Sequence, residues 1–312
     1  MENAIKHYPC SEAQNKEVEI ILKRLTSAHW PEDIYAAREY YDQWGAAISN
    51  EVSIKEISFS QFKGYLLTPK KCQKRVILFF HGGGFVFGSF KSHGGLAAEI
   101  ARVTESQVLH IDYRRAPDFL CPSPIEDALT AYQSLLAQGY QSREIILAGD
   151  SAGGGLVVST MLALKAQQMP MPLLGICICP WVDFTLSGES YDYNKMLDPT
   201  CQKEVAQQVR DLYLGDVSYS EARELSPVYK DLSGLPPLLV QVSDREIFYS
   251  DAFALVAAAK KCGVHVKFDV WENMYHVWHL HYLELESAQL ALAEIKGFID
   301  SILQESALSP II

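Results

Sequence analysis

The chain has 312 residues, with 27 Lys and Arg against 38 Asp and Glu, and a formal net charge of −11. A surface this negative repels phosphate backbones, so we expect no nucleic-acid partner. Hydrophobic residues make up 48% and charged residues 21%, which are globular values that exclude wholesale disorder. At ~150 residues a domain, the length predicts about two domains.

Membrane and secretion signals are absent from the sequence pattern. The longest apolar stretches, such as residues 173–180, fall short of the ~20 residues that span a bilayer. The first residues, MENAIKHYPC, lack the apolar segment typical of a secretory signal. The seven cysteines are irregularly spaced and predict reduced thiols. We therefore expect a cytoplasmic protein with no membrane span.

From residue 51 onward, short apolar runs alternate with helical patterns. Residues 51–60 and 62–68 alternate apolar and polar side chains, as an antiparallel pair with one buried face would. Continuous apolar runs predict strands buried on both faces at 76–80, 108–111, 145–148, 173–179, 238–242 and 264–270. Helical periodicity covers 95–103, 124–138, 153–167, 251–261 and 284–303. This order predicts an α/β fold with a mostly parallel central sheet and helices on both faces.

Two regions break the alternation. Residues 1–45 are helical and rich in aromatic side chains, and no strand is expected there. Residues 187–224 separate two predicted core strands and carry another helical stretch at 201–214. We predict that neither region extends the sheet, and that together they form a helical cap, or lid, over a core made of residues 46–186 and 225–312.

A G-x-S-x-G pattern stands at residues 149–153, with Ser151 at its centre. It follows a buried strand and precedes a helix, which is the context of a nucleophile elbow. The tight turn exposes the serine hydroxyl at the sheet edge, near the positive end of the helix. Glycine-rich turns also produce this pattern by chance, but the strand and helix around it favour Ser151 as a catalytic nucleophile.

A second glycine-rich turn, HGGGF at residues 81–85, follows the predicted strand 76–80. Serine attack on an ester carbonyl creates an oxyanion, which needs fixed N–H donors. Glycines turn their N–H groups toward a cavity with no side chain in the way. We predict Gly82, Gly83 and Ala152 as the oxyanion hole, with Gly84 in support. A phosphate-binding loop is the alternative, but no G-K-[ST] follows.

These motifs occur together with DYRRAP at 112–117, Glu126-Asp127, ELSP at 224–227 and GLPP at 234–237. In this combination the chain resembles the hormone-sensitive-lipase family (bacterial family IV carboxylesterases) of the α/β-hydrolase superfamily, from about residue 50 onward. The resemblance implies an α/β-hydrolase fold, a carboxylesterase acting on acyl esters, a helical cap, and neither a metal nor an organic cofactor. It also implies structural roles for Arg114 and Asp150.

The histidine of such a triad lies beyond the last strand, because the chain order in this fold is serine, acid, histidine. Three histidines occur together in this region. The family-like pattern M-x-H-V-W selects His276. The alternative is a metal site made by His276, His279 and His281.

The triad acid should lie in the loop after the strand 238–242. The family's usual Asp-Pro-Leu is absent there. Aligning the Ser-Asp-Ala that follows places Glu246 at the acid position, and glutamate is an accepted triad acid in this fold. Asp244 is the alternative acid, and Asp251 is expected at the start of the next helix.

We therefore predict a serine carboxylesterase that hydrolyses short- to medium-chain acyl esters through an acyl-enzyme. A lactone, amide or carbamate hydrolase on the same triad is an alternative, and so is a non-catalytic small-molecule receptor on this scaffold. Phe85, Phe87 and Trp278 are expected to line an apolar substrate pocket. By family analogy, the last strand, 264–271, is expected at a sheet edge, where it could form a homodimer.

Overall fold

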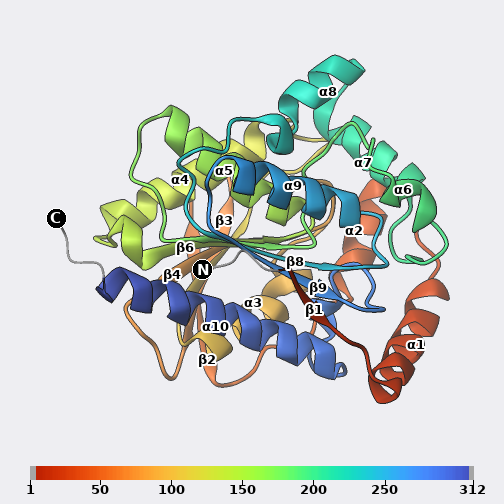
Figure 1. The fold of residues 1–312 in the computed structure, drawn as a ribbon, viewed down its shortest axis with the longest axis horizontal. Coiled ribbons are helices and arrows are strands. Elements are labelled where there is room, and N and C mark those ends of the chain that lie inside the picture. The colour runs from red at the N-terminus through yellow and green to blue at the C-terminus, as the bar shows by residue number, and fades with distance from the viewer. Residues whose placement is uncertain (1–4, 309–312) are drawn as a thin grey trace.

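The computed structural model describes residues 5–308, which build a nine-stranded sheet covered by helices on both faces (Figure 1). The strand order is β1-β9-β8-β7-β6-β4-β5-β3-β2. Only the pairs β2–β3 and β3–β5 are antiparallel, which confirms the mostly parallel sheet. The strands are β1 (Ile5–Tyr8), β2 (Val52–Ser58), β3 (Lys63–Pro69), β4 (Val76–Phe80), β5 (Gln107–Asp112), β6 (Ile145–Asp150), β7 (Gly175–Ile178), β8 (Leu238–Ser243) and β9 (Val266–Trp271).

The longer helices lie in two layers. In Figure 1, α4, α5 and α9 lie above the sheet, and α3 and α10 lie below it. The α-helices are α1 (Glu12–Thr26), α2 (Ile34–Asp42), α3 (Phe90–Thr104), α4 (Ser123–Ala137), α5 (Ala152–Ala166), α6 (Ser190–Tyr193), α7 (Lys203–Leu214), α8 (Tyr219–Leu225), α9 (Tyr249–Lys261) and α10 (Glu286–Leu308). Short 3-10 turns are η1 (Ser142–Glu144), η2 (Pro227–Tyr229) and η3 (Trp278–His281).

The central strands feed two separate hydrophobic cores. Leu78 and Phe80 of β4 join the core under α4, α5 and α9, whereas Ile77 and Phe79 join the core under α3 and α10. Successive strand residues point to opposite faces, so a continuous apolar run is what a strand covered on both sides requires. Because these strands are buried on both faces, their continuous apolar runs made them the easiest elements to predict from the sequence.

The first strand was not expected. Residues 5–8 form β1, which pairs in parallel with β9, and the Tyr8 ring stacks on Trp271 with centroids 4.0 Å apart. The prediction that residues 1–45 contain no strand and cannot extend the sheet is therefore wrong. It follows that β9 is not an edge strand, because β1 occupies its outer edge. The predicted homodimer assumed that β9 has a free edge, and β1 pairs along that edge.

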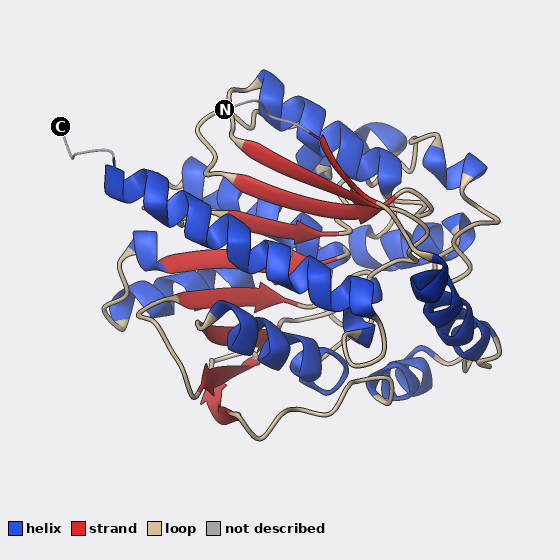
Figure 2. Ribbon diagram, turned by 60° about the horizontal axis from the view of Figure 1, so that its bottom comes forward, coloured by secondary structure: helices blue, strands red, loops and turns tan. Residues whose placement is uncertain are grey.

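All the parallel strands end at one edge of the sheet, as their arrowheads in Figure 2 show. Loops at the carboxyl ends of such strands converge, and open α/β sheets bind ligands there. The loops after β4, β6, β8 and β9 carry the predicted site residues.

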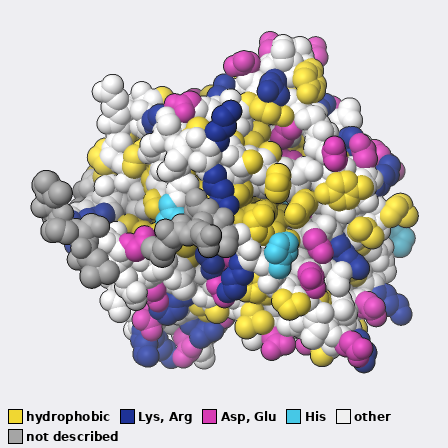
Figure 3. Space-filling view, viewed as in Figure 1, with side chains coloured by type: hydrophobic (Ala, Val, Ile, Leu, Met, Phe, Trp, Pro, Cys, Tyr) yellow, Lys and Arg dark blue, Asp and Glu magenta, His cyan; other side chains and the backbone are white. Residues whose placement is uncertain are grey.

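The surface is mixed. Hydrophobic side chains are exposed between charged ones on the face shown in Figure 3. The exposed hydrophobic residues of the chain include Tyr193 and Met196, in the segment between β7 and β8. Within residues 5–308, no helix is both long enough and apolar enough to cross a membrane.

Candidate active site

Ser151 lies at the turn between β6 and α5, in a backbone conformation with φ 55° and ψ −121°. A positive φ at a non-glycine residue is strained, at a cost of roughly 1–3 kcal/mol. Three backbone hydrogen bonds hold it: the Ser151 N–H donates to the carbonyl oxygen of Ile178 (2.8 Å), and the Ser151 carbonyl accepts from the N–H groups of Trp181 and Gly155 (both 3.1 Å). The surrounding backbone therefore fixes the elbow.

The two glycines of the motif are required by close backbone approach. A Cβ added to Gly153 would lie 2.0 Å from the carbonyl oxygen of Phe80, and one added to Gly149 would lie 2.5 Å from the Gly153 backbone. Real Cβ atoms do not approach so closely, so β6 and α5 can pass β4 only with glycine at these positions. The spacing of the motif thus has a direct steric cause.

A continuous hydrogen-bonded chain connects three of the predicted residues. His276 Nε2 lies 2.8 Å from Ser151 Oγ, and His276 Nδ1 lies 2.6 Å from Glu246 Oε2. Asp244, the alternative acid, is exposed, and its carboxylate accepts from the Asn273 N–H at 2.9 Å. Of the two candidate acids, the structure brings Glu246 to the histidine.

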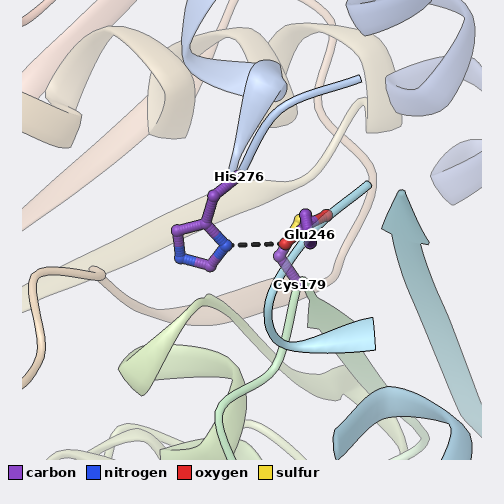
Figure 4. A group of neighbouring side chains, drawn as sticks. All are labelled: Cys179, Glu246 and His276. Atoms are coloured by element: carbon purple, nitrogen blue, oxygen red, sulfur yellow. Dashed lines mark hydrogen bonds and ion pairs between the residues drawn. The ribbon is translucent and has the colours of Figure 1, made fainter. Parts of the chain in front are cut away.

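Glu246 is fully buried, and both of its carboxylate oxygens have donors. Oε2 faces His276, while Oε1 accepts from the Ser243 N–H (2.8 Å) and from the Cys179 thiol (3.0 Å). Burial raises the pKa of Cys179 well above its ordinary value, and the charge of Glu246 raises it further, so the thiol keeps its proton and donates. Figure 4 shows the His276 ring turned toward Glu246, with Cys179 beside the carboxylate. Cys179 is a residue that the sequence motifs did not single out.

Donor atoms of Cys179, Glu246 and His276 lie within 4.8 Å of one another, the one such group found among the described residues. A metal would need the thiol deprotonated, which the raised pKa of Cys179 opposes. The alternative three-histidine metal site is not formed. His279 Nε2 instead bonds Gln241 Oε1 at 3.0 Å, and the His281 ring bonds the Tyr275 hydroxyl.

The pKa of His276 is raised. Burial alone would lower it, but the hydrogen bond and the charge of Glu246, followed by the charges of Asp198 and Asp150, outweigh that effect. The imidazolium form is therefore stabilised inside a buried site, which is what a base that must accept a proton from a hydroxyl requires.

The loop after β4 folds back on itself over the elbow. Gly83 and Gly84 have φ values of 104° and 63°, and the Gly83 carbonyl accepts from the N–H groups of Val86 (3.0 Å) and Phe87 (2.8 Å). A Cβ on Gly82 would lie 2.2 Å from Asp150 Oδ2. The predicted oxyanion donors are the N–H groups of Gly82, Gly83 and Ala152. Within residues 5–308, no loop or side-chain hydrogen bond engages these three N–H groups.

Buried side chains support this loop from behind. The His81 ring stacks on Tyr113 with centroids 4.1 Å apart, and the Tyr113 hydroxyl donates to the His81 carbonyl (2.7 Å). Burial, together with neighbouring positive groups, lowers the pKa of His81 well below its ordinary value, so it stays neutral. Arg114 is bound to Asp127, and Asp150 Oδ2 lies 3.3 Å from His93 Nε2. Arg114 and Asp150 thus make the structural contacts that the resemblance implied.

Two of the predicted pocket residues lie on this loop, and one does not. Phe85 stacks on Tyr213 of α7 at 4.0 Å, and Phe87 lies 6.1 Å from Trp30 between their ring centroids. Side chains from both 1–45 and 187–224 therefore pack against the loop. Trp278 is completely buried in the core under α3 and α10, where its ring lies 4.1 Å from His279. Its prediction as a pocket residue is wrong, because Trp278 packs in the core under α3 and α10, whereas Phe85 belongs to the core under α4, α5 and α9.

A family model described as the alpha/beta hydrolase fold matches residues 77–280. A solved esterase of the bacterial hormone-sensitive lipase family is 36% identical, with a TM-score of 0.88, covering 93% of this chain and 98% of that one. The chain belongs to this family. An acetyl-hydrolase of Streptomyces hygroscopicus is 36% identical over 74% of this chain and 77% of its own length.

A structure of EstE5 soaked with p-nitrophenyl butyrate is 30% identical, with a TM-score of 0.87, and covers 92% of this chain and 98% of that one. Membership confirms the predicted family and the α/β-hydrolase fold. It also confirms the predicted enzyme class, a carboxylic ester hydrolase.

Proposed function

We propose that this chain is a serine carboxylesterase that cleaves short- to medium-chain acyl esters through an acyl-enzyme. The observation that carries the proposal is the hydrogen-bonded chain from Ser151 Oγ through His276 to the buried carboxylate of Glu246. A strained, backbone-fixed serine beside an oriented imidazole is the arrangement that activates a hydroxyl nucleophile.

In the first half of the reaction, His276 Nε2 takes the proton of Ser151 as Oγ attacks the ester carbonyl carbon. The resulting oxyanion is held by the N–H groups of Gly82, Gly83 and Ala152, with Gly84 allowing the loop to turn. Glu246 stabilises the imidazolium. The imidazolium then gives its proton to the leaving alkoxide, so an alcohol departs and the acyl-enzyme remains.

In the second half, His276 takes a proton from water, and the hydroxide attacks the acyl carbonyl. The collapsing intermediate releases the carboxylic acid, and His276 returns the proton to Ser151 Oγ. Neither half of this reaction uses an atom from a cofactor.

The proposed preference for short- to medium-chain acyl groups is based on the side chains around the glycine-rich loop after β4. Phe85, Trp181, Phe184 and Tyr213 form an aromatic group beside it, which suits an apolar acyl chain. Of the predicted cap, 1–45 and 187–224, residues 1–4 lie outside the described residues and β1 belongs to the sheet; we propose that residues 9–45 and 187–224 act as the cap over the core. Such a cap favours chains short enough to fit beneath it. The cytoplasmic location and the absence of nucleic-acid partners stay predictions.

The proposal is tested with a fluorophosphonate, which reacts with activated serines, and with p-nitrophenyl esters of increasing acyl length. We expect one mole of label per mole of protein, on Ser151, with matching loss of esterase activity, and the highest kcat/KM at short or medium chains. A label on another residue would reject Ser151 as the nucleophile. Faster turnover of lactones, amides or carbamates would favour the alternative substrates, and binding without turnover would favour the receptor.

The raised pKa of His276 predicts the pH dependence. The catalytic base must be neutral, so kcat/KM should fall as the pH drops through the pKa of His276 in the free enzyme. Because that pKa is raised, the acid midpoint should lie above the 6.5 of an ordinary imidazole. Asp198→Asn removes one of the charges that raise it and should move the midpoint to lower pH. An unshifted midpoint in the variant would contradict the assigned contribution of Asp198.

Cys179 offers a test of the support for Glu246. Cys179→Ser keeps a donor toward Glu246 Oε1 and should retain kcat within about threefold. Cys179→Ala removes the donor and should lower kcat by roughly 10- to 150-fold, which corresponds to the loss of about 1.5–3 kcal/mol for a hydrogen bond to a charged group. Steady-state kinetics on p-nitrophenyl butyrate distinguish the two. Equal activity of both variants would show that the thiol contributes only packing.

A further inference from the structure

The loop that carries Glu246 has little internal support. It runs from the end of β8 at Ser243 to the start of α9 at Tyr249. Its own backbone hydrogen bonds are long: the Glu246 N–H donates to the Ser243 carbonyl at 3.4 Å, and the Tyr249 N–H donates to the Glu246 carbonyl at 3.2 Å. The Ser243 N–H holds the Glu246 carboxylate from within the loop (2.8 Å), but the loop backbone needs partners from elsewhere to stay in one conformation.

Those partners come from the segment around α6, between β7 and β8. The Ser190 hydroxyl donates to the Ile247 carbonyl at 2.5 Å and accepts from the Ser250 N–H at 2.9 Å. The Ser190 N–H donates to the Ser250 hydroxyl at 2.9 Å, and Asp198 Oδ2 accepts from the Ile247 N–H at 3.3 Å. Side chains from one segment thus meet the backbone of the acid-bearing loop at several points.

Asn194 makes the contact closest to the acid. Its side chain is 1% exposed, and its Nδ2 donates to the carbonyl oxygens of both Asp244 (2.9 Å) and Glu246 (2.8 Å). A side-chain amide is suited to this position, because its NH₂ group carries two donors on one atom. The bridge spans the turn at residues 244–246 and so fixes the direction in which the Glu246 side chain leaves the backbone.

Asn194 is itself anchored at the end of α6. Its N–H donates to the Ser190 carbonyl at 3.0 Å, and its own carbonyl accepts from the N–H groups of Leu197 (2.8 Å) and Asp198 (3.0 Å). The amide cannot move without moving the segment. Any displacement of this segment, which belongs to the proposed cap, is transmitted to residues 244–246.

We propose that Asn194 is a positioning residue for Glu246, through which the segment between β7 and β8 sets the orientation of the triad acid and of His276. This inference rests on the proposed triad. Misplacement of a catalytic group by about 1 Å can cost ~100-fold in rate. The effect should fall on kcat, since the Asn194 contacts are with the loop backbone and not with the substrate pocket.

Asn194→Asp is the sharpest variant, because it keeps the shape of the side chain but turns carboxylate oxygens toward two carbonyl oxygens. We expect kcat for p-nitrophenyl butyrate to fall roughly 10- to 100-fold, with KM changed less than about threefold. The acid midpoint of kcat/KM should move to lower pH in Asn194→Ala, which removes the donors without adding a charge, because Glu246 then loosens its hold on His276. Met196→Ala, at a side chain that is 87% exposed on the same segment, is the matched control and should leave kcat unchanged.

A double-mutant cycle separates positioning from general damage. If Asn194 acts through Glu246, Asn194→Asp should change kcat less than about threefold in a Glu246→Ala background. The residual rate of the Ser151→Ala variant is subtracted from each measurement. Equal losses in both backgrounds, or an effect on KM alone, would overturn the inference and leave the triad standing. An unchanged kcat in Glu246→Ala by itself would overturn the triad and this inference with it. Should Asn194→Asp not fold, Asn194→Ala, which removes the donors without adding charge, is measured in the same cycle.

Discussion

Ser151→Ala is expected to lower kcat for p-nitrophenyl butyrate by about 10⁶-fold, the loss seen when a triad serine is removed from a site whose other parts remain. The hydroxyl that lies 2.8 Å from His276 Nε2 is the only group replaced. Alanine keeps a Cβ at the strained φ of 55°, so it neither relieves nor adds backbone strain. Activity should therefore disappear with the fold intact.

Thermal unfolding supplies the control for this experiment. Ser151→Ala should melt close to the parent protein, whereas Ser151→Gly should be more stable by roughly 1 kcal/mol, because glycine adopts a positive φ without strain. Both variants should be equally inactive. A Ser151→Ala protein that turns over the ester at the parent rate would refute the proposed nucleophile.

Glu246→Ala is expected to lower kcat by about 10⁴-fold, and Asp244→Ala by less than about threefold. Glu246 holds the imidazole in its working tautomer through a 2.6 Å hydrogen bond to Nδ1 and stabilises its charged form. Asp244 is only two positions away but is exposed and bonded to the Asn273 backbone. The pair is thus a matched comparison of two acids in one loop.

The measurement is kcat and KM for both variants on p-nitrophenyl butyrate, with far-ultraviolet circular dichroism to show that each is folded. In Glu246→Ala the imidazolium of His276 loses its main negatively charged partner. The pH profile of kcat/KM for this variant should therefore lose the raised acid midpoint. A large loss in Asp244→Ala with a small one in Glu246→Ala would reverse the assignment.

The parts of the site that lie in sequence motifs were predictable, because steric and hydrogen-bonding demands act there on neighbouring residues. The elbow needs Gly153 because its Cβ would meet the Phe80 carbonyl, and this demand appears as a fixed spacing around Ser151. Glu246 was reached by alignment of the residues after it, and the structure brings it to His276.

Contacts between distant segments were not predictable. Asn194 and Cys179 support Glu246 from 52 and 67 residues away, and neither belongs to a recognisable pattern. Trp278 stands in the same motif as His276, but motif membership does not reveal which face of the chain a side chain takes. The helix α3 begins at Phe90, five residues before its predicted start, because Ser89 caps it and polar residues in its first turn weakened the apolar pattern.

The pairing of β1 with β9 also determines the order in which the sheet can be completed. Ile5 lies beside Phe268, so these partners are about 260 residues apart in the chain. At synthesis rates of ~5–20 residues per second, β1 waits on the order of 10–50 s for its partner. Until then β1 has no strand to pair with. Once β9 forms, β1 can cover its outer edge, which would otherwise be open to pairing with other chains. The four residues of β1 therefore cover the edge of the last strand to be synthesised. A chain shortened past Tyr8 would leave the backbone of β9 unpaired along that side.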